Sequence, residues 1–295
     1  MHDGEVPVDD ELVRRLLAAS FPAWRDLPFA RVPSAGTDHA LYRLGDDMVV
    51  RLPRIEWALG QIEHDAWVLP RLAPHLPVAI PEQLAIGEPA AGYPWRWAVY
   101  RWLRGEVLGL DRPEDPIRLA TDLAAFVVAL RALDTDGVPP AGAHSRLAPL
   151  ITRDDDTRGY IASLQGTVDT PALTASWEDA LRAPGWDRPG AWAHTDLLPG
   201  NLLLVEDRLS AVIDLGGAGV GDPAVDVMPA WATLPREVRG VFRAAVDVDD
   251  ATWARGRGWA LVFAVAALPY YRDRNPTLAA IAARTIDEIL REREG

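Results

Sequence analysis

The chain has 295 residues, 49% of them hydrophobic, which is enough for one large domain or for two lobes with their own cores. It contains no cysteine, which excludes disulfide bonds and thiolate metal sites, and all 30 of its basic residues are arginine. The net charge of −13 disfavours nucleic acid as a partner and favours a cationic small molecule. The alternative interpretation is that the acidic surface only keeps the protein soluble.

No segment of the sequence has the character of a targeting or membrane segment. Residues 1–11 are acidic and polar, unlike a signal peptide. The longest apolar run, 259–268, has about half the length that a membrane-spanning helix needs, so it predicts a buried helix. We therefore expect a cytoplasmic protein with no membrane partner, and the sequence leaves its oligomeric state open.

The N-terminal part of the sequence predicts a small β-rich region. A first helix, capped by Asp9 or Asp10, carries apolar residues at helical spacing. Short apolar runs bounded by turn residues follow it, and a second helix is expected at 57–72. The expected strands are 29–32, 40–44, 48–52, about 83–86 and 96–100, with a loop at 34–39 and a connector at 101–105.

After residue 105 the sequence becomes mainly helical. Two short apolar runs, 202–205 and 209–213, are separated by Glu-Asp-Arg and predict a β-hairpin. The polar stretch 154–174 shows no clear periodicity and receives no assignment. Apolar spacing predicts helices at 117–133, 176–182, 225–233, 236–246, 253–268 and 277–293. Four tryptophans of this part are interpreted as core residues: Trp186, Trp192, Trp231 and Trp259.

Polar side chains gather at one end of the predicted hairpin. Asp196 precedes its first strand, Asn201 begins that strand, and Asp214 follows the second strand. Because a hairpin returns the chain on itself, Asn201 and Asp214 are expected to be neighbours in space. Two carboxylates and an amide oxygen suit Mg²⁺, which prefers hard oxygen ligands. The alternative is that these are ordinary turn residues.

The order and spacing of these residues match those of a phosphoryl-transfer site. The kinase catalytic loop reads H-R-D-x-x-x-x-N and is followed by the metal-binding aspartate of D-F-G. Here His194-Thr195-Asp196 is followed after four residues by Asn201, and Asp214 is followed by Leu-Gly. Phosphoryl transfer uses one carboxylate to orient the attacking hydroxyl, and another carboxylate and an amide to hold metal ions. The combination favours this chemistry over three unrelated turns.

The sequence resembles the aminoglycoside phosphotransferases and their relatives, which include macrolide phosphotransferases and choline- or homoserine-type kinases. Their catalytic loop usually reads H-G-D-x-x-P-G-N, and a G-D-P-x-x-D segment, here 221–226, follows it. The stretches VVRLPR and VYRWLRGE add to the resemblance, which covers roughly 32–231. It implies an α+β, two-lobed, protein-kinase-like fold, with a small β-rich nucleotide-binding lobe at 1–103 and a larger, mainly helical catalytic and substrate-binding lobe at 104–295.

The resemblance also implies roles for the residues of the loop, with ATP and Mg²⁺ as cofactors. Asp196 would be the catalytic base, while Asn201 and Asp214 would hold Mg²⁺. His194 would brace the loop, and Asp226 would anchor the catalytic segment from a helix. Thr195 stands where the family commonly has glycine, which we treat as a small change.

A lysine on the third strand normally binds the nucleotide phosphates in this group, and this chain has no lysine. Arg51 stands at that position, and macrolide phosphotransferases resemble the chain there too. An arginine can bind phosphate bidentately, although the exchange is not neutral. Its helix partner is expected to be Asp65, because Asp65 lies on the apolar stripe of the second helix and Glu63 lies near the opposite face.

The remaining nucleotide contacts are expected from two segments. The connector would take the adenine, with backbone hydrogen bonds near Arg101 and Leu103. The loop at 34–39 would cover the phosphates with its amides and the hydroxyls of Ser34 and Thr37. The glycine-rich run 216–221 follows a strand, but it does not read G-x-G-x-x-G and no β-α-β unit surrounds it, so we reject a dinucleotide site there.

We therefore predict ATP- and Mg²⁺-dependent transfer of the γ-phosphoryl group to a hydroxyl of a small molecule. The resemblance and the acidic charge favour a cationic acceptor, in first place an aminoglycoside-type antibiotic. A macrolide or a choline- or homoserine-type metabolite is the alternative acceptor. An alternative of another class is a nucleotide-binding pseudokinase that acts as a partner or sensor, which only the missing lysine supports.

Overall fold

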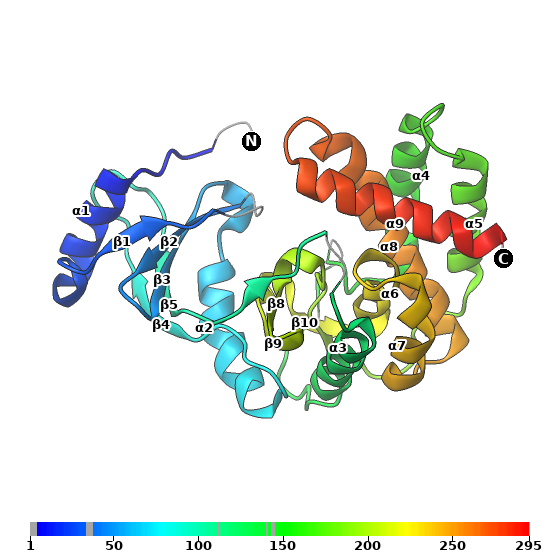
Figure 1. The fold of residues 1–295 in the computed structure, drawn as a ribbon, viewed down its shortest axis with the longest axis horizontal. Helices are drawn as coiled ribbons and strands as arrows, with labels where there is room; N and C mark the ends of the chain where they lie inside the picture. Colours follow the sequence, from blue (N-terminus) through cyan, green and yellow to red (C-terminus); the bar gives the residue numbers. More distant parts are fainter. Residues whose placement is uncertain (1–4, 34–37, 111–112, 140, 143–144, 295) are drawn as a thin grey trace. The chain divides into compact units, whose positions relative to one another are not determined.

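The computed structural model describes residues 5–33, 38–110, 113–139, 141–142 and 145–294. These residues form two compact units (Figure 1). The N-terminal unit comprises residues up to Pro74 together with Ala79–Arg104, and the C-terminal unit comprises His75–Val78 and the residues from Gly105 onward. The first is rich in β-structure and the second is mainly helical, which confirms the predicted α+β class.

An antiparallel sheet of five strands forms the centre of the N-terminal unit, in the order β1-β2-β3-β5-β4. Two helices accompany it, α1 (Asp10–Ser20) and α2 (Gln61–Leu72). All five predicted strands are confirmed to within about two residues. The strands are β1 (Phe29–Arg31), β2 (His39–Leu44), β3 (Met48–Pro53), β4 (Gln83–Gly87) and β5 (Trp97–Arg101).

The two faces of this sheet have different environments. Val50 and Leu52 of β3 are fully buried in one apolar cluster with the inner face of α1. Arg51 lies between them in sequence and therefore points to the other face, where α2 contributes Asp65. The sequence pattern alone did not say which face of β3 is buried, and the packing of α1 decides it.

Helix α2 begins four residues later than predicted. Gly60 adopts a left-handed conformation with φ of 85° and interrupts the helical pattern that starts at Trp57. The segment before it forms a short 3-10 helix, Glu56–Ala58. The first helix follows its prediction: Asp9 is the N-cap, and its carboxylate accepts a hydrogen bond from the Leu12 N–H at 2.8 Å.

The C-terminal unit combines helices with two small antiparallel sheets, which are β7 with β10 and β6 with β8 and β9. The two longest helices, α8 and α9, pack against each other (Figure 1). The helices are α3 (Pro116–Arg131), α4 (Asp154–Ser163), α5 (Thr170–Arg182), α6 (Pro229–Ala232), α7 (Arg239–Val246), α8 (Asp250–Tyr271) and α9 (Pro276–Glu294). The strands are β6 (Glu106–Val107), β7 (Ala191–Ala193), β8 (Leu202–Val205), β9 (Arg208–Val212) and β10 (Gly219–Gly221).

One prediction for this unit was wrong, and one stretch that had no assignment is helical. The single helix expected at 225–233 is a 3-10 helix, Pro223–Val227, followed by α6, because Pro229 cannot donate the hydrogen bond that would continue the helix. The unassigned stretch 154–174 contains α4 and the start of α5. Helix α4 buries only Thr157 and Ile161, so it lacks the apolar periodicity by which a helix is recognised.

The tryptophans fill the core of the C-terminal unit as predicted, with one exception. Trp192, Trp231 and Trp259 are almost fully buried, and Trp177 joins them. Trp186 is half-buried at the surface of a pocket. Within the ranges that the structure describes, no helix combines the length and the apolar character needed to cross a membrane.

Candidate active site

The loop that follows β7 carries the predicted catalytic residues. Strand β7 is buried and leads directly into His194, which is fully buried, and Thr195, which is 4% exposed. Asp226 accepts two backbone hydrogen bonds from this loop, from the His194 N–H at 2.7 Å and the Thr195 N–H at 2.8 Å. Its burial raises the pKa of Asp226, and the two N–H donors oppose that effect. Asp226 therefore fixes the backbone that precedes Asp196.

His194 ties this loop to the end of the hairpin. Its Nε2 lies 3.0 Å from the Ile213 carbonyl oxygen, and its Nδ1 accepts the Asp196 N–H at 3.2 Å. A neutral imidazole that carries its proton on Nε2 satisfies both contacts at once. The ring is fully buried, so the geometry supports a bracing role for His194, whereas the Asp196 side chain is 29% exposed and accessible to a substrate.

Thr195 adopts a backbone conformation that suits glycine. Its φ is 77°, a value that β-branched residues rarely adopt, so the exchange of the family's glycine for threonine is a larger change than we predicted. Two hydrogen bonds hold the strained residue: its N–H donates to Asp226, and its carbonyl accepts from Arg146 Nη1 at 3.0 Å. A Cβ at Gly217 would lie 2.5 Å from Thr195 Oγ1, so the glycine makes room for the threonine side chain.

The structure brings Asn201 and Asp196 into direct contact. Asn201 Nδ2 donates to the Asp196 backbone oxygen at 2.8 Å and to its Oδ2 at 2.8 Å. Both partners are acceptors, so the amide nitrogen must face Asp196, and the amide oxygen remains available for another ligand. A 3-10 turn, Pro199–Asn201, delivers this side chain to the start of β8.

Asp214 lies at the same end of the hairpin as Asn201. The Ile213 N–H donates to the Asn201 carbonyl at 2.9 Å and extends the pairing of β8 with β9 by one step, which places Asp214 immediately beyond it. Asp214 has a left-handed backbone, with φ of 65° and ψ of 60°, and an exposed side chain. Such conformations are uncommon outside glycine and gather at functional sites. The predicted proximity of Asn201 and Asp214 is therefore present in the fold.

In the N-terminal unit, Arg51 and Asp65 form the expected ion pair. Arg51 Nη1 lies 3.0 Å from Asp65 Oδ2, and the two side chains are 13% and 2% exposed. Tyr100 donates to the same carboxylate oxygen at 2.7 Å, and burial followed by the Asp65 charge raises the pKa of Tyr100. Glu63, the alternative partner, is half exposed and pairs with Arg96. The pair exists in the structure, and its role toward a nucleotide stays a prediction.

Further groups orient the Arg51 guanidinium. Gln61 Oε1 accepts from Arg51 Nη2 at 2.9 Å, and His39 Nδ1 lies 3.4 Å from the same nitrogen. Burial, with the Arg51 charge as a second cause, holds the pKa of His39 well below its ordinary value. A neutral His39 can accept from the guanidinium, so the arginine is held by groups of β2 and α2 together.

A family model described as the phosphotransferase enzyme family matches residues 30–259 of this chain. The chain belongs to that family. It is therefore an enzyme that transfers a phosphoryl group to an alcohol group. Comparison with curated proteins finds no match.

Solved structures of two kinds of phosphotransferase resemble this one. The GDP and kanamycin complex of APH(2″)-IIIa is 20% identical, with 94% of this chain and 97% of that chain covered and a TM-score of 0.69. The streptomycin–ATP ternary complex of APH(2″)-IIa is 16% identical, with 97% of each chain covered and a TM-score of 0.63. Macrolide 2′-phosphotransferase MphH from Brachybacterium faecium, as apoenzyme, is 26% identical, with 92% and 98% covered and a TM-score of 0.61. These likenesses agree with the kinase-like fold expected for a phosphotransferase.

Two other segments of the phosphotransferase were predicted to contact the nucleotide. In the connector, the Arg101 N–H donates to the Glu82 carbonyl at 2.9 Å and the Trp102 N–H donates to the Asp47 carbonyl at 2.7 Å. An adenine would therefore use the Arg101 carbonyl or the backbone of Leu103, and not the Arg101 N–H. Ser34 and Thr37 lie outside the described residues, so their contribution stays a prediction.

One residue of the phosphotransferase site was missed. Arg146 lies in the loop between α3 and α4, and its Nη1 contacts both the Thr195 carbonyl and the Asp196 carboxylate. No spacing rule connects an arginine with an aspartate 50 residues later, so only the fold reveals the contact. The glycine run at 216–221, which we rejected as a dinucleotide loop, accounts for this placement, because Gly219 and Gly221 allow Leu147 to pack closely beside Arg146.

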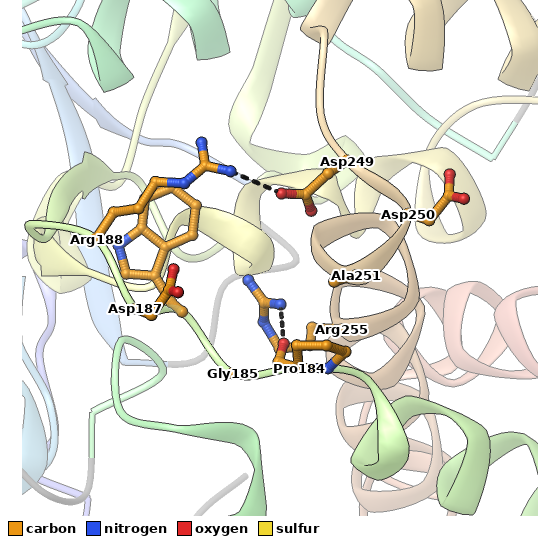
Figure 2. A pocket seen from close by; sticks show the side chains of 9 residues that line it. Pro184, Gly185, Asp187, Arg188, Asp249, Asp250, Ala251 and Arg255 are labelled. Atoms are coloured by element: carbon orange, nitrogen blue, oxygen red, sulfur yellow. Dashed lines mark hydrogen bonds and ion pairs between the residues drawn. The ribbon is translucent and has the colours of Figure 1, made fainter.

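The C-terminal unit also has a pocket of about 630 Å³ that contains none of the predicted site residues (Figure 2). Figure 2 shows the loop at 184–188 facing the first turn of α8, with Arg188 paired to Asp249 at 3.0 Å. This loop precedes β7, whereas the catalytic loop follows that strand. The pocket is lined by Pro184, Gly185, Trp186, Asp187, Arg188, Asp249, Asp250, Ala251 and Arg255.

Proposed function

We propose that this phosphotransferase moves the γ-phosphoryl group of ATP, with Mg²⁺, to a hydroxyl of a small cationic molecule, in first place an aminoglycoside-type antibiotic. The observation that carries the proposal is the contact of Asn201 Nδ2 with Asp196 Oδ2 at 2.8 Å. Phosphoryl transfer needs a base beside a metal-binding amide oxygen, so this contact supports the proposal. The dependence on ATP favours a cytoplasmic location.

In this proposal Asp196 is the general base. Its carboxylate would accept the proton of the substrate hydroxyl while the hydroxyl oxygen forms a bond to the γ-phosphorus, and the bond from that phosphorus to the β,γ-bridging oxygen breaks to release ADP. Because Asn201 and Arg146 hold the two carboxylate oxygens, the base is oriented before the substrate arrives. Asp226 and His194 would maintain this orientation through the backbone.

The donor set at the end of the hairpin fits Mg²⁺. The Asn201 amide oxygen is turned away from Asp196, and Asp214 presents an exposed carboxylate at the same end of the strands. Hard oxygen donors of this number suit Mg²⁺, which completes its coordination with water and phosphate oxygens. Across the described ranges, no three His, Asp or Glu side chains form a metal cluster. When bound, Mg²⁺ would offset charge on the phosphates.

At the nucleotide, Arg51 would take the place of the usual strand lysine. Its guanidinium is already oriented by Asp65, Gln61 and His39, which reduces the entropy that it would lose on binding phosphate. The adenine would lie against the connector near the Arg101 carbonyl and Leu103. Ser34 and Thr37 would cover the phosphates.

Two observations bear on the acceptor. The net charge of −13 favours cationic amino-sugars, and enzymes that bind kanamycin and streptomycin share the fold. A macrolide is the second candidate, because the macrolide 2′-phosphotransferase from Brachybacterium faecium is 26% identical over 92% of the chain.

The decisive experiment measures consumption of Mg-ATP against a panel of aminoglycosides, macrolides and simple amino-alcohols, with Asp196→Ala as the control. We expect turnover with one class of acceptor and a loss of at least about 100-fold in the variant. Turnover with neutral metabolites alone would exclude an antibiotic as the acceptor. Nucleotide binding without turnover on any acceptor of the panel would refute these acceptor classes and point to a metabolite outside them, and absence of nucleotide binding would refute the proposal.

A further inference from the structure

The carboxylate of Asp196 is held from both sides. Asn201 Nδ2 donates to Oδ2 at 2.8 Å, and Arg146 Nη1 contacts Oδ1. A single partner would leave the carboxylate free to rotate about its last side-chain torsion, which is a broad and soft torsion. Two partners on different oxygens fix that rotation. Arg146 is therefore the second of the two groups that determine how the base presents its oxygens.

The backbone beside Arg146 is firmly packed. Leu147 is 5% exposed, and its carbonyl accepts the Asp222 N–H at 3.3 Å. A Cβ at Gly221 would lie 2.5 Å from the Leu147 oxygen, and one at Gly219 would lie 2.9 Å from its Cδ1. The contact at Gly221 is with backbone and only glycine allows it, so β10 packs directly against the residue that follows Arg146.

The side chain of Arg146 is also oriented by the strained part of the catalytic loop. The nitrogen that contacts Asp196 donates to the Thr195 carbonyl at 3.0 Å as well. A residue with φ of 77° presents its carbonyl in a direction that an ordinary extended backbone would not give. The left-handed conformation at Thr195 thus supplies one of the two acceptors that place the guanidinium next to the base.

We propose that Arg146 is a positioning residue for Asp196, which fixes the rotation of the catalytic carboxylate and offsets its repulsion toward the incoming anionic γ-phosphoryl group. The inference rests on the proposed function, in which Asp196 is the base. Its physical reason is that a base and a phosphoryl group approach one another with like charge, and a cation beside the carboxylate lowers that repulsion. Arg146 acts through Asp196 and takes no proton itself.

The test compares Arg146→Ala with a matched control, Arg158→Ala. Arg158 pairs with Asp154 in the same unit, and the two side chains are 42% and 28% exposed, against 43% and 29% for Arg146 and Asp196. We expect Arg146→Ala to lower kcat by about 10- to 100-fold with the KM for ATP changed by less than about threefold, since misplacement of a reacting group costs rate and not ground-state binding. The control should keep kcat within about twofold of the wild type and should keep its Tm. Arg146→Ala also loses the hydrogen bond to the Thr195 carbonyl and should have a Tm lower by a few degrees, so both variants are assayed well below that temperature.

Arg146→Lys separates the charge from a merely structural role. The lysine variant keeps a positive charge on a shorter side chain. We expect its kcat to be at least about threefold higher than that of Arg146→Ala. Equal kcat values for the lysine and alanine variants, or a kcat for Arg146→Ala within about twofold of Arg158→Ala, would overturn the inference. If the wild type consumes no Mg-ATP with any acceptor, the proposed function fails and this inference fails with it, so the two failures are distinguished by the wild-type measurement.

Discussion

Gly221→Ala should damage both stability and catalysis, because Gly221 lies against the backbone of Leu147. A Cβ there would be 2.5 Å from the Leu147 carbonyl oxygen and 2.7 Å from its Cβ. The first distance is about 0.9 Å short of the 3.4 Å at which ordinary contact begins. A backbone oxygen cannot rotate away as a side chain can, so β10 or the Leu147 segment must move by about that amount.

The size of both effects follows from this displacement. Forced overpacking costs about 1–3 kcal/mol, and weakening of the Asp222 to Leu147 hydrogen bond adds about 0.5–1.5 kcal/mol. We therefore expect the free energy of unfolding to fall by about 2–4 kcal/mol. Arg146 is the neighbour of Leu147, so a movement near 1 Å should also disturb the base and reduce kcat by about 10- to 100-fold.

Urea unfolding and steady-state kinetics with Mg-ATP measure the two effects. The matched control is Gly159→Ala, which lies in the exposed middle of α4, where an added methyl group would meet no other atom within 4 Å. That change should raise the free energy of unfolding by about 0.5–1 kcal/mol, as expected for glycine to alanine in a helix. A Gly221→Ala protein with wild-type stability and wild-type kcat would refute the argument that the glycines of β10 place Arg146.

Two further predictions concern other parts of the chain. Asp65→Asn should raise the KM for ATP and lower kcat/KM by about tenfold or more, because it leaves Arg51 without its buried charged partner. Glu63→Gln should keep both constants within about twofold in the same assay. The reverse order of effects would show that Glu63 is the functional partner. The pKa of Asp249 is lowered from its ordinary value of 3.8 by side-chain and backbone hydrogen bonds to Thr252. The ionised Asp249 therefore stabilises the fold when the pH is above that ordinary pKa, and this contribution is lost as the pH falls through the lowered pKa. Asp249→Asn should therefore be less stable than the wild type near pH ~6 in urea unfolding and should approach it near pH ~2, and a constant difference at both pH values would contradict the assignment.

The sequence could predict the elements whose signal is local. Strand alternation, the capping aspartate of α1 and the hairpin of β8 and β9 need only neighbouring residues, and all of them are present in the structure. The choice of Asp65 over Glu63 as partner of Arg51 needed only helical geometry, and the structure contains that ion pair.

What the sequence could not predict depends on contacts between distant segments. Arg146 reaches Asp196 through a loop whose position is set by the glycines of β10. The strain at Thr195 is visible only as a backbone angle, and its compensation by Asp226 and Arg146 involves three separate segments. Helix α4 has too few buried residues to produce a periodic signal.

If Arg51 binds the nucleotide phosphates as proposed, the arginine on β3 also determines which reagents can react at that site. A lysine at that position would offer an amine, which reacts with acylating reagents once it has lost its proton. Arg51 offers a guanidinium that stays protonated at neutral pH, and the chain has no lysine elsewhere. Only the α-amino group could react, so this enzyme should escape amine-based profiling of a cell lysate even when its nucleotide site is fully active.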